Sequence, residues 1–252
     1  IMVGTPRNPI VIKAKNNGQG LAVINSQKHS RLANVNFSDL QRFKVDSWEL
    51  PSSVTFYNSS VTIEQCKFDN NLAGDDYLNI FRSDFELKNS AFSNCLADAF
   101  DGDFVIGTID NVTFNNVGND GIDFSGSSIK ANNVSFNHVG DKAISVGERS
   151  QLSGNNITIS NAEIGVNSKD ASVVNFANSR IDSTRVPLIA FMKKAEYGPS
   201  AIYAENVSMQ NFEVTYMLEG ESQIVIDGES KEATHEDVKS LLYGAEFGKS
   251  SK

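Results

Sequence analysis

The sequence predicts an all-β fold, a parallel β-helix solenoid with coils of roughly 22 residues and a short C-terminal capping helix. Three observations predict it: an apolar residue that recurs at this stride, polar residues at fixed offsets from it, and short alternating strand patterns between them. A repeat this short cannot bury its own apolar side chains, so it becomes stable only by stacking on further copies. The apolar column consists of Phe68, Phe92, Phe114, Phe136, Ile159 and Ile181.

Two polar columns flank the apolar one. Asn predominates in both, and Asn tolerates left-handed backbone while its amide can bond the next Asn along a stack. The columns therefore predict the turns between strands. The first lies three residues before each apolar anchor and the second two residues after it: Gln65, Asn89, Asn111, Asn133, Asn156 and Asn178, then Asn70, Asn94, Asn116, His138, Asn161 and Ser183.

Between these turns the chain alternates apolar and polar residues with period two, as in 61–68, 108–114 and 133–136. This alternation is typical of strands. Leucine-rich and helical repeats are excluded, because neither a Leu-x-x-Leu-x-Leu consensus nor a long stretch of 3.6 periodicity occurs. Neighbouring coils of a β-helix lie about 4.8 Å apart, so equivalent side chains stack in register along the axis.

The chain is predicted to be a single β-helix domain over residues 1–252, because no Pro-rich, Gly/Ser-rich or single-charge segment divides it. We expect irregular N-terminal coils in 1–53, regular coils in 54–227, and a C-terminal cap and tail in 228–252. A short amphipathic helix is predicted over 234–244, with Thr234 and Asp237 at its N-terminal cap and Gly244 at its end. We expect this helix to cover the last coil and to protect an open β edge.

The formal net charge of -9 disfavours nucleic acid as a partner, because binding to phosphates needs a basic surface. No apolar run reaches the roughly 18 residues of a membrane span, and no signal peptide opens the chain. We expect a monomer that works outside the cell or at the cell surface.

Acidic residues recur after the second polar column. Allowing a two-residue insertion in the first copy, the segments 76–79, 98–101, 120–123 and 142–145 align. The third position of each is apolar and must point inward, so the fourth position points outward on the same strand. The first positions are Asp76, Asp98, Asp120 and Lys142, and the fourth positions are Asn79, Asp101, Asp123 and Ser145.

Carboxylates stacked about 5 Å apart repel each other by roughly 1 to 4 kcal/mol per neighbouring pair. A divalent cation, a shared proton or the ammonium of Lys142 would offset this repulsion. Turn chemistry on a solvated polar face is the alternative, and it accounts for the first positions but not for the outward fourth positions. The candidate ligands for a cation, expected to be Ca²⁺, are Asp98, Asp101, Asp120 and Asp123.

Together with the repeat length and the Asn columns, the segments 98–104, 118–126 and 140–148 resemble the right-handed parallel β-helix superfamily typified by pectate lyases and polygalacturonases. The resemblance covers roughly residues 54–227 and lies at the level of the fold. It implies an enzyme that acts on an acidic polysaccharide through one outward strand face. The polygalacturonase pattern is incomplete, because Asp75-Asp76 is present but neither Gly-His-Gly nor Arg-Ile-Lys occurs.

The resemblance and the acidic rows together predict a polysaccharide lyase that carries out β-elimination or a related proton abstraction at C5. A cation held by the aspartates would stabilise an enolate-like intermediate, with Lys142 as the base and Asp101 and Asp123 as further catalytic residues. A base near neutral pH needs a lowered lysine pKa, and neighbouring carboxylates act in the opposite direction. The alternative for Lys142 is a salt bridge that closes the acidic row.

Further residues are candidates for contact with a uronic-acid-containing chain, through charge, hydrogen bonds or stacking. The alternative for those in loops is an ordinary solvated surface. Two other classes of function stay open: a glycoside hydrolase that uses paired aspartates, and a non-catalytic polysaccharide-binding or surface solenoid. The candidate substrate-binding residues are Asn79, Arg82, Ser145, Lys169, Lys193 and Tyr197.

Overall fold

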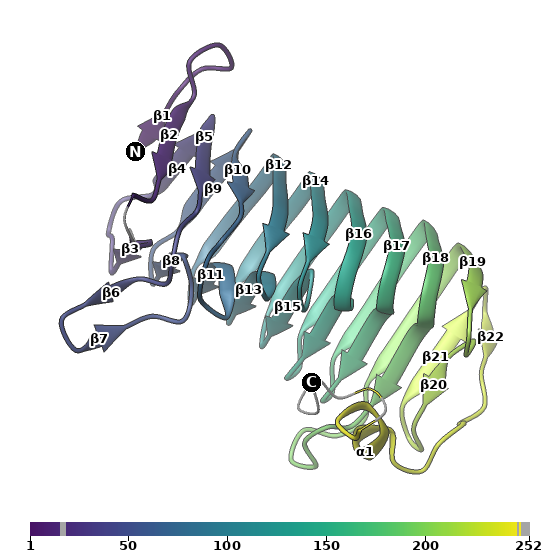
Figure 1. The fold of residues 1–252 in the computed structure, drawn as a ribbon. Coiled ribbons are helices and arrows are strands. Elements are labelled where there is room, and N and C mark those ends of the chain that lie inside the picture. The colour runs from purple at the N-terminus through teal and green to yellow at the C-terminus, as the bar shows by residue number, and fades with distance from the viewer. Residues whose placement is uncertain (16–18, 246, 248–252) are drawn as a thin grey trace.

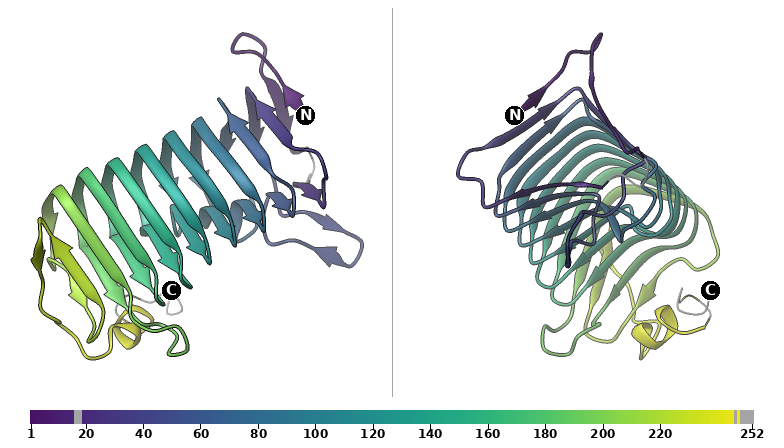
Figure 2. Two further views of the ribbon diagram at one scale, coloured as in Figure 1. Left: turned by 180° about the vertical axis from the view of Figure 1, so that it is seen from behind. Right: turned by 60° about the vertical axis from the view of Figure 1, so that its left-hand side comes forward.

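The computed structural model describes residues 1–15, 19–245 and 247, and it confirms the predicted parallel β-helix (Figure 1). The coils stack along one axis, which the right-hand view of Figure 2 shows nearly end on. Hydrogen-bonded strands from successive coils form three parallel ladders along this axis. In the described part of the chain, no helix has the length and apolarity that a bilayer crossing requires.

The ladder that carries the acidic residues is called the acidic face here. Its strands pair in parallel from coil to coil. They are β3 (Leu21–Ile24), β8 (Val54–Tyr57), β11 (Asp76–Phe81), β13 (Asp98–Asp103), β15 (Ile122–Ser125), the last parts of β16 (Ser128–Gly147), β17 (Gln151–Lys169) and β18 (Val173–Phe191), and β20 (Met217–Leu218).

The other two ladders share the long strands, which bend at a polar column and continue from one face to the next. A short antiparallel hairpin projects where the sequence interrupts the stride. The second ladder has β1 (Met2–Val3), β4 (Ser30–Ala33), β9 (Val61–Glu64), β12 (Asp84–Cys95), β14 (Ile106–Val117), the first parts of β16 to β18, β19 (Ala201–Phe212), β21 (Gln223–Ile226) and the antiparallel β22 (Glu229–Ser230). The third has β2 (Ile10–Lys13), β5 (Val35–Ser38), β10 (Lys67–Asp69) and the later parts of β12, β14 and β16 to β19, and the hairpin is β6 (Lys44–Val45) and β7 (Trp48–Glu49).

Both polar columns are turns, as their composition predicts. Their members have φ between 50° and 57°, in the left-handed region where Asn is favoured over other residues with a side chain. Amide groups bond along the columns: Asn111 Nδ2 donates to Asn89 Oδ1 at 2.8 Å, and Asn116 Nδ2 donates to Asn94 Oδ1 at 2.8 Å. These bonds fix the register between coils.

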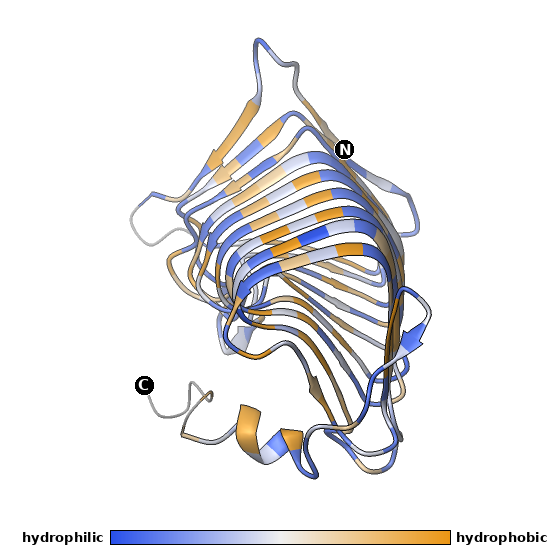
Figure 3. Cartoon of the chain, turned by 90° about the vertical axis from the view of Figure 1, so that its right-hand side faces the viewer, coloured by the Kyte–Doolittle hydropathy of each residue, from blue (hydrophilic) through white to orange (hydrophobic). Residues whose placement is uncertain are grey.

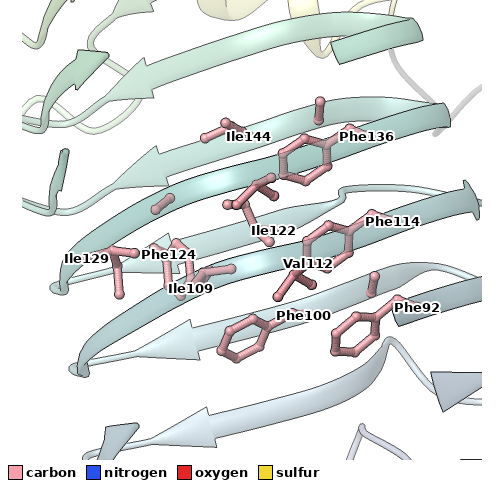
Figure 4. Packing of buried hydrophobic residues seen from close by; sticks show 14 of the residues in the cluster. Phe92, Phe100, Ile109, Val112, Phe114, Ile122, Phe124, Ile129, Phe136 and Ile144 are labelled. Atoms are coloured by element: carbon pink, nitrogen blue, oxygen red, sulfur yellow. The ribbon is translucent and has the colours of Figure 1, made fainter. Parts of the chain in front are cut away.

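The apolar column forms the centre of the core. Ring centroids of Phe68 and Phe92 are 4.4 Å apart, those of Phe92 and Phe114 4.9 Å, and those of Phe114 and Phe136 4.8 Å. Figure 4 shows Phe92, Phe114 and Phe136 stacked from coil to coil. All four side chains are buried. Each contributes about 1.5 to 3 kcal/mol through burial, so the stack holds the coils in register and makes the outward faces rigid.

The C-terminal helix is shorter than predicted. Helix α1 spans Val238–Leu242, whereas the sequence predicted 234–244. Asp237 is the N-cap, and its Oδ1 accepts a bond from Ser240 N at 2.8 Å. Thr234 takes no part in this cap, because its backbone N–H and hydroxyl bond to the backbone of Leu218 instead. Tyr243 is the C-cap residue, and Gly244, predicted at the end of the helix, directly follows it.

The position of α1 also differs from the expectation that it covers the end of the last coil. Val238 and Leu242 pack in a cluster apart from the main core, on outward side chains of the acidic face. Figure 3 shows α1 beside the coils. The physical reason is that the outward positions of this face become apolar where the helix covers them, at Ile164, Val186, Ile189 and Met217.

Candidate active site

Outward side chains of the acidic face form three rows along the solenoid axis, each with one residue per coil. Strand register aligns the members of each row. The structure thus brings most of the predicted site residues onto one face. The first row is Asp76, Asp98, Asp120, Lys142 and Ile164, the second is Asn79, Asp101, Asp123, Ser145 and Asn167, and the third is Tyr57, Phe81, Asp103, Ser125, Gly147 and Lys169.

Carboxylates of the first row bond to the backbone of the next coil. Asp98 Oδ1 accepts from Asp120 N at 2.9 Å and from Asn119 Nδ2 at 2.5 Å. Asp120 Oδ1 accepts from Lys142 N at 3.1 Å. An acidic residue at this position therefore accepts a hydrogen bond from a buried backbone N–H group of the next coil. This bond holds the carboxylate of the acidic residue in place.

Three carboxylates converge and are called the acidic cluster: Asp98, Asp120 and Asp123. One oxygen of each lies within 4.8 Å of the others. Burial raises the pKa of Asp98 to about 6 and the pKa of Asp120 to about 7. The ammonium of Lys142 opposes the increase at Asp120, whereas the charge of Asp98 adds to it. Protonated carboxyl groups are therefore present at mildly acidic pH.

Asp101, the fourth predicted cation ligand, does not belong to this cluster. Among the residues that the structure describes, the carboxylates that converge within 4.8 Å of one another do not include that of Asp101. Its Oδ2 accepts a bond from Asn79 Nδ2 at 2.9 Å. Burial raises the pKa of Asp101 well above its ordinary value, and the charges of Asp76 and Asp103 raise it further. Asp101 and Asn79 thus form a hydrogen-bonded pair beside the cluster.

Lys142 lies at the end of the acidic part of the first row and is buried. Its Nζ is 2.6 Å from Asp141 Oδ2 and 3.5 Å from Asp120 Oδ1. Burial alone would lower the pKa of Lys142, but the charges of Asp120 and Asp141 outweigh this effect and raise the pKa. This geometry is that of a salt bridge that closes the acidic row, which is the alternative to Lys142 acting as a base.

Lys169 reaches back across two coils to the cluster. Its Nζ lies 3.0 Å from Ser145 Oγ and 3.5 Å from Asp123 Oδ1. The stem passes over Gly147, where an added Cβ would lie only 2.6 Å from Lys169 Cε. Ser145 and Lys169, both predicted to contact substrate, therefore bond to each other, and Lys169 places a positive charge at Asp123.

A cleft of about 300 Å³ separates the acidic cluster from α1. The cluster, Lys142 and Lys169 line one side, and Lys193, Leu242, Tyr243 and Phe247 line the other. Lys193 Nζ lies 4.6 Å from the ring centroid of Tyr243. The two aromatic side chains of this wall were not among the predicted site residues, because their place depends on where α1 docks.

The last two predicted residues, Tyr197 and Arg82, lie away from this cleft. Among the described residues, Tyr197 is not part of the cleft lining; its ring centroid is 5.4 Å from Arg149 Cζ. Arg82 is exposed at a turn that follows the third row, and its Cζ lies 5.3 Å from the ring centroid of Phe81. Of the two residues predicted from the loop after β18, Lys193 thus lines the cleft and Tyr197 does not.

The acidic cluster meets some, but not all, of the requirements of a site for a divalent cation. Hard cations prefer carboxylate oxygens, and three of them converge here. However, Asp98 and Asp120 each use one oxygen for backbone N–H groups, and ammonium groups lie 3.5 Å from Asp120 and Asp123. The second oxygens of these carboxylates would have to hold the cation.

Comparison with known proteins adds a family to this geometry. Residues 1–167 match the family described as rhamnogalacturonase A/epimerase, pectate lyase-like. Neither the curated proteins nor the solved structures gave a match. The matched range covers two thirds of the chain and contains the acidic cluster and Lys142. A parallel β-helix with an acidic outward face agrees with this match, and the chain belongs to the rhamnogalacturonase A/epimerase, pectate lyase-like family.

Proposed function

We propose that this chain cleaves a uronic-acid-containing, pectin-like polysaccharide at the acidic cluster, and that its aspartates exchange protons with the substrate. Membership of the family supports a carbohydrate-active enzyme. The observation that carries the proposal is the convergence of Asp98, Asp120 and Asp123 within 4.8 Å at the wall of a cleft. We expect such a substrate outside the cell or at its surface.

Glycoside hydrolysis is the reaction that this arrangement favours. It needs one protonated carboxyl group to donate to the leaving oxygen and one ionised carboxylate to activate water or attack the sugar. Asp120, with a pKa of about 7, is suited to the role of acid. Asp123, whose carboxylate lies 3.5 Å from the ammonium of Lys169, is suited to the second role. Neighbouring carboxylates raise the pKa of both Lys142 and Lys169, so neither supplies a neutral amine at neutral pH.

Cation-assisted β-elimination is the second candidate, because three carboxylate oxygens converge at one point. Asp98, Asp120 and Asp123 would hold the cation, expected to be Ca²⁺, which when bound would neutralise the carboxylate of the uronate. Lys142 would act as base only where the charges of Asp120 and Asp141 are masked. If this candidate holds, Ca²⁺ raises the unfolding temperature of the wild-type chain at pH 7 and has no such effect on Asp123→Asn.

One experiment separates these reactions. The chain is incubated with uronic-acid polysaccharides, including polygalacturonate and rhamnogalacturonan, with calcium or with a chelator. Hydrolysis releases reducing ends without ultraviolet absorbance and withstands the chelator, whereas elimination gives unsaturated products that absorb and stops when calcium is removed. Asp120→Asn should be inactive, and Glu86→Gln, on an exposed side chain of β12, is the matched control. A chain that binds these polymers without releasing any product contradicts cleavage and favours a binding solenoid.

A further inference from the structure

A partly exposed aromatic and cationic surface begins in the third row of the acidic face and continues into the turns that follow it. Tyr57 and Phe81 are register partners on β8 and β11, and their rings stack in parallel with centroids 5.2 Å apart. The ring of Phe104 packs edge-on against Phe81, with centroids 5.7 Å apart. Arg82 Cζ lies 5.3 Å from the centroid of Phe81 and 5.9 Å from that of Phe104. These four residues are called the aromatic shelf.

Phe104 occupies a left-handed turn that recurs from coil to coil, and Phe is an unusual residue for that backbone conformation. Its φ is 54°, in the left-handed region. The same turn is left-handed in the neighbouring coils, at Asn58 (φ 46°), Arg82 (49°), Gly126 (61°) and Glu148 (52°), and of these residue types Asn and Gly suit the conformation. Phe104 is also 56% exposed, so burial offsets little of the strain. An exposed aromatic side chain at a turn that Asn or Gly would occupy with less strain is available for a function at that position.

The space next to the Phe104 ring is open to a ligand. The ring lies over Gly126, where an added Cβ would be 2.7 Å from Phe104 Cδ1. A shallow pocket of about 450 Å³ continues from there, lined by Phe104, Ile106 and Gly126 on one side and by Arg149 on the other. A ring face and an open pocket are thus adjacent.

Charge at this surface suits an anionic ligand. Arg82 and Arg149 are both exposed. Within the part of the chain that the structure describes, neither guanidinium forms an ion pair with a carboxylate. In a chain with a net charge of -9, these two arginines place positive charge next to the exposed ring of Phe104, although Asp103 lies beside it. Arginine pairs readily with carboxylates such as those of uronic acids.

The aromatic shelf is continuous with the acidic cluster. Phe81 is the register partner of Asp103, and Asp103 is the partner of Ser125, which follows Asp123 by two residues on β15. A polysaccharide chain bound at the cluster therefore has to span only a few strand spacings to reach the shelf.

We propose that the aromatic shelf and Arg149 form a binding subsite for uronate-containing sugars of the polysaccharide that lie away from the bond that is cleaved. The apolar face of one sugar packs on Phe104, and the carboxylates of neighbouring sugars pair with Arg82 and Arg149. This subsite rests on the proposed function, because it binds the same polymer that the acidic cluster cleaves.

The decisive variant is Phe104→Asn, because Asn occupies the same turn at residue 58 and suits its backbone. A structural role for the ring predicts a lower unfolding temperature, whereas a binding role predicts an equal or higher one. Binding of polygalacturonate is measured by calorimetry in an Asp120→Asn background, so that the ligand is not consumed. We expect Phe104→Asn to weaken binding by about tenfold, in the range that aromatic stacking contributes. Val11→Asn, at a 64% exposed apolar residue of another ladder, should not change the affinity.

A second binding experiment varies the charge of the ligand. Arg82→Gln should weaken binding of polygalacturonate by several-fold and leave binding of its methyl ester unchanged, whereas Phe104→Asn should weaken both. If the background chain binds and Phe104→Asn binds equally well, the subsite is refuted and the proposed function stands. If the background chain binds no uronic-acid polysaccharide, the proposed function fails and the subsite fails with it.

Discussion

Lys169 Nζ lies 3.5 Å from Asp123 Oδ1, although two coils separate the residues along the chain. The stem crosses Gly147, so the contact depends on the absence of a side chain there. The ammonium of Lys169 beside Asp123, together with the raised pKa of Asp120, places two carboxyl groups of one cluster in different electrostatic environments. This difference is what acid–base chemistry requires.

Replacing Lys169 by Met should remove this charge and destabilise the protein. The side chains of Lys169 and Asp123 are 6% and 26% exposed, so water compensates only part of the loss. We expect the free energy of unfolding to fall by about 1 to 3 kcal/mol, the range for a hydrogen bond to a charged group, as measured by urea unfolding. Lys194→Met removes the contact to Glu148 from a side chain that is 42% exposed, and it should cost less. Equal losses in the two variants would show that Lys169 is no more than a surface charge.

Replacing Asp120 by Asn should separate stability from activity. The amide Oδ1 can still accept the bond from Lys142 N, so the unfolding temperature should stay within a few degrees of the wild type. Cleavage should fall by about 10² to 10⁴-fold, the contribution of a general acid, as measured by kcat/KM. Asp141→Asn removes the other partner of Lys142 and should change kcat/KM only a few-fold. A similar loss in both variants would assign the effect to Lys142 rather than to proton transfer from Asp120.

Much of this arrangement could be predicted from the sequence. The spacing of the Phe and Asn columns determined the coils, and the alternation of strands then placed Asp98, Asp120 and Asp123 on one outward face. The remainder depends on contacts between distant segments. The first row becomes apolar at Ile164, and α1 packs where this change occurs. The sequence pattern around 234–244 contains no information about this docking site.

The contacts of Lys169 and Tyr197 also escaped prediction, for a related reason. Gly147 determines how far Lys169 reaches, and it lies on the preceding coil. Tyr197 lies near Arg149, whereas Lys193 from the same loop after β18 lines the cleft. Spacing along the chain describes the repeated strands well, but it carries no information on loops that depart from the repeat.

Stability should depend on pH through the acidic cluster. The pKa values of Asp98 and Asp120 in the folded chain, about 6 and about 7, exceed the usual Asp value of about 3.9. Folding therefore favours the protonated groups, so their contribution is fully present below pH of about 4 and is lost as the pH rises through 6 and 7. The unfolding temperature, measured by circular dichroism with a chelator present, should fall between pH 4 and pH 7.

The double variant Asp98→Asn, Asp120→Asn is the control for this dependence. It retains amide oxygens as acceptors for the backbone N–H groups but has no carboxyl group to ionise at these positions. Its unfolding temperature should change much less over the same pH interval. A wild-type chain whose stability instead rises from pH 4 to pH 7 would contradict the raised pKa values.

Asn133 tests how the polar columns stabilise the coils. Its φ is 54°, its Nδ2 donates to Asp110 Oδ1 at 3.0 Å, and its Oδ1 accepts from Asn156 Nδ2 at 2.8 Å. Asn133→Ala loses both bonds and strains the backbone, whereas Asn133→Gly loses the bonds but accepts the left-handed conformation. We expect the Ala variant to lose about 1 to 3 kcal/mol in urea unfolding, and the Gly variant to lose less. Equal losses in the two variants would attribute the role of Asn133 to its hydrogen bonds alone. A smaller loss in the Ala variant would contradict the backbone argument. It would mean that the greater flexibility of Gly in the unfolded chain outweighs the strain of Ala in the folded one.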